Sequence, residues 1–71
     1  MIDITATGEN IKRLMVKNKV TYKDIQRALC FNTPQAIYKW MRGECLPSID
    51  NMIVLADMFN CKIDDIVIVD K

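Results

Sequence analysis

The chain of 71 residues has no histidine, and its three cysteines form no C-x-x-C pair. Zinc sites are ordinarily built from cysteine and histidine, and histidine is the commonest acid–base catalyst, so neither kind of site is expected in its usual form. The two glycines form no phosphate-binding glycine loop. We therefore expect no metal, no cofactor and no enzymatic activity.

Long hydrophobic runs are absent as well. The longest mostly apolar stretch, Met52 to Phe59, is interrupted by Asp57 and is too short to span a membrane. The first residues lack the basic region and apolar run of a signal peptide. We expect a cytoplasmic protein in which the cysteines are reduced and serve as small, partly buried hydrophobic residues.

Size and charge distribution are more informative than these absences. A chain of this length forms one small domain, residues 1–71, whose core rarely supplies more than about 3–5 kcal/mol of net stability, so a dimer partner would help it. Residues 1–43 carry eight basic and three acidic side chains, a net charge of +5, whereas residues 44–71 carry two basic and six acidic ones, a net charge of −4. This division suits one face directed at phosphates and another at solvent or a partner. Two ordinary solvated helix faces would give the same pattern.

Capping residues and apolar periodicity predict the first two helices. The first would be capped by Thr7 and end near Asn18, and the second would begin after Thr21, with Asp24 completing a capping box. The residues that these helices would bury are Ile11, Leu14 and Met15, followed by Ile25, Ala28 and Leu29.

A third helix is predicted after a turn at residues 30–32. Thr33 is its expected N-cap, the helix runs from Pro34 to about Arg42, and Gly43 supplies the left-handed residue that ends it.

The fourth helix is predicted to start after Ser48 and to end at Asn60, and a short fifth helical turn would contain the pair Asp64-Asp65. The expected apolar stripe of the fourth helix is Ile49, Met52, Ile53, Ala56 and Phe59. The fold class is therefore all-α, a compact bundle of four to five short helices. Residues 1–5 and 66–69 have strand-like patterns, and these terminal strands would pair within the subunit or with a neighbouring one.

The predicted third helix is amphipathic in a way that suits DNA recognition. Its polar residues Gln35, Tyr38, Lys39 and Arg42 fall within an arc of about 100°, and Ile37, Trp40 and Met41 lie opposite. Glutamine pairs bidentately with adenine, arginine does so with guanine, and lysine more often contacts phosphate. An ordinary solvated helix face is the alternative. Trp40 is expected in the core rather than as a stacking platform for bases, and Tyr38 fits either role.

Several motifs occur in one order along the chain, and through them it resembles the lambda-repressor-like, Xre-type helix-turn-helix family of bacterial and phage transcription regulators. The motifs are Thr21 opening the second helix, the Asp24-Ile25 step, residues 34–40, Arg42-Gly43-Glu44, Leu46-Pro47-Ser48 and the helix of residues 51–66.

This resemblance implies that the third helix enters the major groove of double-stranded DNA while the second helix braces it. The residues that it implicates are Gln35 as a base reader, Ala36, Tyr38 and Lys39 near bases or sugars, and Lys23, Thr33 and Arg42 near phosphates. It further implies a repressor that is a homodimer at least on DNA, reads two half-sites and has no small-molecule ligand. Residues 66–69 are the candidate dimer surface, although closing the subunit's own core would explain them equally well.

The chain departs from the family pattern in the turn, which has about one residue more than the commonest form and has Cys30 at the usual glycine position. Cysteine is unfavourable at positive φ, so this residue indicates a different turn geometry. A second hypothesis is a protein-interaction module, such as an antitoxin-like or anti-repressor component, that binds a protein through the third helix or the acidic C-terminal part.

Overall fold

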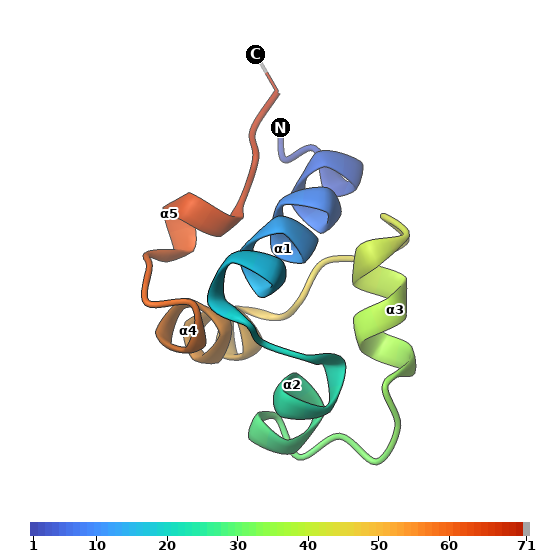
Figure 1. Cartoon of the computed structure of the whole chain (residues 1–71). Coiled ribbons are helices and arrows are strands. Elements are labelled where there is room, and N and C mark those ends of the chain that lie inside the picture. Colours follow the sequence, from blue (N-terminus) through green and yellow to red (C-terminus); the bar gives the residue numbers. More distant parts are fainter. Residues whose placement is uncertain (71) are drawn as a thin grey trace.

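The computed structural model describes residues 1–70, so Lys71, the last residue of the predicted domain, lies outside them. Five helices occupy this part of the chain, which confirms the all-α prediction (Figure 1): α1 (Ile4–Asn18), α2 (Tyr22–Ala28), α3 (Gln35–Met41), α4 (Ile49–Met58) and α5 (Ile63–Ile66). Among residues 1–70, the only β-type pairing is one antiparallel bridge between Ile2 and Val69. None of the helices within this range is long and apolar enough to cross a membrane.

The first helix begins four residues earlier than the sequence predicted, at Ile4. Asp3 is its N-cap, and the Asp3 carboxylate accepts a hydrogen bond of 2.9 Å from the Ala6 backbone N–H. An aspartate side chain in extended backbone caps a helix as well as threonine does, and here it outweighs the strand-like alternation of residues 1–5. The prediction of Thr7 as N-cap is therefore wrong, and the strand-like pattern of residues 1–5 gives only the bridge at Ile2, because residues 4 and 5 are helical.

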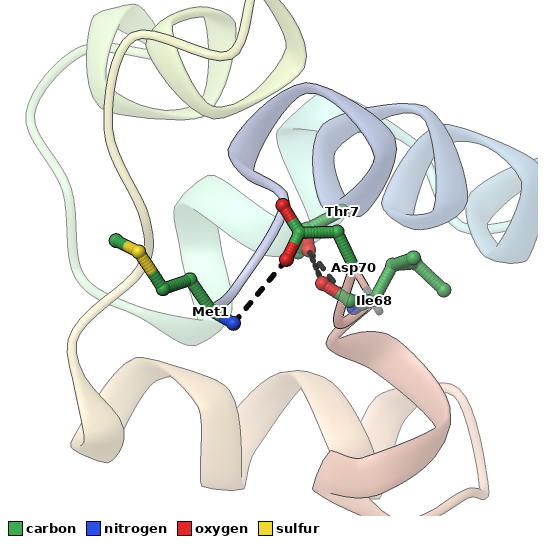
Figure 2. Close-up of polar contacts among 4 residues, drawn as sticks. All are labelled: Met1, Thr7, Ile68 and Asp70. Atoms are coloured by element: carbon green, nitrogen blue, oxygen red, sulfur yellow. Dashed lines mark hydrogen bonds and ion pairs between the residues drawn. The ribbon is translucent and has the colours of Figure 1, made fainter.

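Thr7 instead joins the two ends of the chain (Figure 2). Its buried hydroxyl accepts a hydrogen bond of 3.0 Å from the backbone N–H of Ile68, and the Asp3 backbone N–H donates to the Ile68 carbonyl at 2.8 Å. The Met1 ammonium lies 3.2 Å from a carboxylate oxygen of Asp70. Of the two predicted alternatives for the terminal segments, pairing within the subunit is the one observed. The predicted C-terminal strand of residues 66–69 is too long, because Ile66 belongs to α5 and is fully buried.

Asn10 makes a second connection between α1 and the C-terminal part. Its side-chain N–H groups donate to the carbonyls of Asp65 at 2.7 Å and Ile66 at 2.9 Å, and its oxygen accepts from the Arg13 guanidinium. The amide is buried with both its oxygen and its nitrogen hydrogen-bonded, so these bonds offset the desolvation cost of burying it while they hold α5 against α1.

Four helices end in the same Schellman arrangement, in which a left-handed residue turns two N–H groups back to the last carbonyls. The left-handed residues are Lys19, Cys30, Gly43 and Asn60. The predicted stops at Gly43 and Asn60 are confirmed. Cys30 has φ 57°, so it adopts the left-handed conformation that suits the glycine usual at this position in the family pattern. The predicted change of turn geometry at Cys30 is therefore wrong.

The core is formed by residues from all five helices: Ile11, Leu14, Met15, Ile25, Ile37, Trp40, Met52, Leu55, Ala56, Phe59 and Ile66. The predicted stripe of α4 is partly wrong, because Ile49 and Ile53 are 65% and 56% exposed whereas Leu55 is fully buried. Ala28, which was predicted to be buried, is also exposed, and Ile25 is the fully buried residue of α2. Apolar residues surround much of α4, so composition alone could not identify the face that packs on α5.

Gly8 allows α1 and α3 to pack against each other at backbone distance. A Cβ atom placed on Gly8 would lie 2.2 Å from the carbonyl oxygen of Trp40 and 3.2 Å from that of Met41. Real Cβ atoms do not approach oxygen so closely, so a larger residue would force the two helices apart. This contact fixes the last turn of α3 on the bundle.

We predict that Gly8→Ala lowers the free energy of unfolding by about 1–3 kcal/mol, because the added methyl group overpacks the contact with Trp40. The sign is diagnostic, since glycine to alanine in an unconstrained helix stabilises by roughly 0.5–1 kcal/mol. Urea unfolding measures the change, and Glu9→Ala at the next, exposed position of α1 is the control. A higher unfolding midpoint for Gly8→Ala would contradict the packing.

Candidate nucleic-acid interface

The outer face of α3 carries the polar residues that the sequence placed there. Gln35, Tyr38, Lys39 and Arg42 are exposed and together line one shallow surface concavity. The opposite face is buried through Ile37 and Trp40. In Figure 1 the helix lies at the edge of the bundle, on the other side of α1 from α5. The predicted division of α3 into an apolar and a polar face is confirmed.

Trp40 anchors α3 from its buried side. Its side chain is only 3% exposed, and the Phe31 ring from the preceding turn packs edge-on against it with centroids 6.0 Å apart. The indole therefore belongs to the core, as predicted, and cannot serve as a stacking platform for bases. With this face fixed, α3 cannot rotate to hide its polar residues.

Tyr38 is held by an aromatic contact between α2 and α3. The rings of Tyr22 and Tyr38 meet edge to face, with centroids 5.1 Å apart, and Tyr38 remains 42% exposed. The sequence had left the role of Tyr38 open. Its ring contributes both to the joint between the two helices and to the exposed surface.

The start of α3 differs from the prediction. The helix begins at Gln35 and its N-cap is Pro34, whose side chain offers no oxygen, so no side-chain hydrogen bond caps the helix. Thr33 is exposed and does not act as the cap. Ala36 is half-buried against the core, so it forms the edge of the polar face rather than its centre.

The start of α2 agrees with the prediction. The Thr21 hydroxyl accepts from the Asp24 backbone N–H at 3.1 Å, and the Asp24 carboxylate accepts from the Thr21 backbone N–H at 2.9 Å. The hydrogen bond from the Thr21 backbone keeps the pKa of Asp24 below its usual value. This capping box orients the first turn of α2, from which Tyr22 and Lys23 project.

A second, basic concavity lies beside the turn between α2 and α3. It is lined by Lys23, Gln26, Arg27, Cys30, Phe31 and Asn32, and the Gln26 side chain donates to the Asn32 carbonyl at 3.2 Å. Sequence reasoning singled out Lys23 but not Arg27. The spacing of four residues between them was the available signal, because it places both cations on one face of α2.

Arg42, at the end of the polar face, forms an ion pair with Glu44 that the sequence analysis did not predict. Its Nε donates to a carboxylate oxygen of Glu44, and the two side chains are 60% and 50% exposed. The guanidinium at this end of α3 is therefore partly neutralised in the free protein.

The geometry has a counterpart among known protein families. A family model described as helix-turn-helix matches residues 11–66, which extend from the middle of α1 to the end of α5. Comparisons with curated proteins and with solved structures gave no match.

We predict that Cys30→Gly raises the free energy of unfolding by about 0.5–1 kcal/mol, because glycine adopts the left-handed conformation without the clash that a Cβ atom causes. Cys30 is exposed, so little packing is lost. Cys30→Ala removes the same thiol but keeps the Cβ atom, and serves as the control. Equal stabilities of the two variants in urea unfolding would show that the left-handed backbone of Cys30 is not strained.

Proposed function

Since the chain belongs to the lambda-repressor-like, Xre-type helix-turn-helix family, we propose that it binds double-stranded DNA sequence-specifically and acts as a repressor of transcription. The observation that carries this proposal is the exposed polar face of α3, anchored from behind by Trp40. A rigid helix with a free polar face at the edge of a domain suits insertion into the major groove.

The individual roles follow from side-chain chemistry. Gln35, in the first turn of α3, is proposed to read an adenine through its amide, and Lys39 and Tyr38 to contact neighbouring bases or sugars. Half-buried Ala36 would face the groove only through its methyl group. We assign phosphate contacts to Lys23, Thr33 and Arg42.

The concavity beside the turn extends this proposal to Arg27. Lys23 and Arg27 are both exposed on α2 and line the same surface depression. Two cations on the helix next to α3 are suited to the sugar–phosphate backbone that borders the major groove. The net charge of +5 on residues 1–43, which contain α2 and α3, supports DNA as the partner.

The test of this function is the salt dependence of duplex binding. The protein should bind any duplex weakly and a selected sequence tightly, and the logarithm of the binding constant should fall linearly with the logarithm of salt concentration because counterions are released. Selection of bound duplexes from a random pool supplies the specific sequence. Affinity that stays at background at low salt would contradict DNA binding and favour a protein-interaction module.

We further propose a homodimer on DNA that uses the surface around the terminal bridge. Five apolar side chains remain exposed there: Met1, Ile2, Ile4, Ile68 and Val69. A second copy of the chain could cover them around a two-fold axis, and the two copies would then read half-sites about one helical turn apart.

For Gln35→Ala, we predict that base preference relaxes at one position in each half-site, with a loss of about 1–3 kcal/mol in specific binding free energy. Binding to unrelated duplexes should change little, because the amide contacts no phosphate in this proposal. Selection from a random pool compares the preferences of the variant and the wild type. An unchanged preference would remove Gln35 from base recognition.

For Val69→Ser, we predict that cooperative binding to a duplex with two half-sites weakens by roughly fivefold or more, because the subunit contact is lost. Binding to a single half-site should stay the same. Ile53→Ser is the matched control, since Ile53 on α4 is 56% exposed and Val69 is 58% exposed. Equal cooperativity in both variants would contradict the proposed dimer surface.

A further inference from the structure

Glu44 is held next to the polar face of α3 by the backbone rather than by its own side chain. The left-handed Gly43 turns the chain, and the Glu44 backbone N–H donates to the Lys39 carbonyl at 3.0 Å while that of Gly43 donates to the Trp40 carbonyl at 3.2 Å. These two hydrogen bonds form the Schellman arrangement that ends α3. The Glu44 side chain therefore extends from the last turn of this helix, and its carboxylate contacts Arg42.

Glu44 is an acidic residue placed beside a basic surface. Glu44 is the first residue after the basic segment 1–43, and its carboxylate contacts the guanidinium of Arg42, which lines the same concavity as Gln35 and Lys39. A negative charge therefore lies at the edge of a surface whose other charged groups are cationic.

We infer that Glu44 limits the affinity of this surface for DNA of any sequence, because its carboxylate competes with phosphate for Arg42 and repels the DNA backbone. The inference rests on the proposed function and adds a negative determinant to it. A protein whose phosphate contacts are weakened in this way depends more on base contacts for tight binding, and spends less time on non-specific DNA.

The opposite role, in which Glu44 holds Arg42 ready for a phosphate, is less well supported by the geometry. Both side chains are half-exposed or more, and a solvent-exposed ion pair orders its partners only weakly. The backbone hydrogen bond of Glu44, in contrast, fixes the point from which its charged side chain extends at the end of α3. The permanent effect is therefore the electrostatic one.

The experiment measures binding of fluorescently labelled duplexes of unrelated sequence by anisotropy over a range of salt concentrations. Glu44→Gln keeps the backbone position and side-chain size but removes the charge. We expect its affinity to rise by roughly two- to fivefold at low ionic strength, and the slope of the salt dependence to steepen by up to about 0.9, the contribution of one phosphate contact. Unchanged or weaker binding would overturn the inference.

Asp64→Asn is the matched control, because Asp64 is an exposed acid on α5, which lies across α1 from α3 (Figure 1). It changes the net charge by the same amount, so a gain equal to that of Glu44→Gln would show that only total charge matters and would also overturn the inference. If wild-type protein binds no duplex even at low salt, the proposed function itself fails. Wild-type binding without a gain in Glu44→Gln rejects the role of Glu44 alone.

The route through Arg42 is tested by combining substitutions. In an Arg42→Ala background, Glu44→Gln should increase affinity by less than it does in the wild type, because the cation that the carboxylate occupies is gone. An equal gain in both backgrounds would show that the effect does not pass through Arg42, and would overturn the competition that we infer.

Discussion

The arrangement of the molecule depends on the close contact between α1 and α3. The chain has only two glycines, and both lie at this contact: a Cβ on Gly8 would meet the Trp40 carbonyl at 2.2 Å, and one on Gly43 would meet the Thr5 hydroxyl at 2.9 Å. Because side chains are absent at both points, the two helices approach at backbone distance. Trp40 and Ile37 are then buried behind α3, and the polar residues of that helix have no other orientation than toward solvent.

The ends of the helices place the functional groups as much as the helices do. Left-handed residues at positions 30 and 43 turn the chain immediately before and after the segment that contains α3. The first brings Phe31 onto Trp40, and the second brings Glu44 beside Arg42. Two turns of the same left-handed type thus anchor the start of α3 and place a negative charge at its end.

Local signals in the sequence were sufficient for much of this structure. The Thr21–Asp24 capping box, the Ser48 cap and the stops at Gly43 and Asn60 depend on neighbouring residues, and these predictions are confirmed. The polar face of α3 also follows from the helical period. The expected partial burial of the three cysteines is wrong for Cys30 and Cys45, which are exposed, and holds for Cys61.

What could not be predicted depends on contacts between distant residues. The roles of Gly8 and Asn10 depend on the packing of α1 against α3 and α5, and neighbouring residues in the chain do not indicate those contacts. The buried side of α4 was misjudged for the same reason, because Ile53 and Leu55 are equally apolar and only packing distinguishes them. The ion pair of Glu44 with Arg42 was not predicted, because it requires the left-handed turn between them.

The most direct test of the central claim, that the polar face of α3 enters DNA, is amide chemical-shift mapping by NMR during titration with a duplex selected from a random pool. The largest changes should fall on residues 33–42 and on the first turn of α2, with smaller ones at Glu44. Changes confined to α4, α5 and the terminal bridge, with α3 unaffected, would contradict the claim.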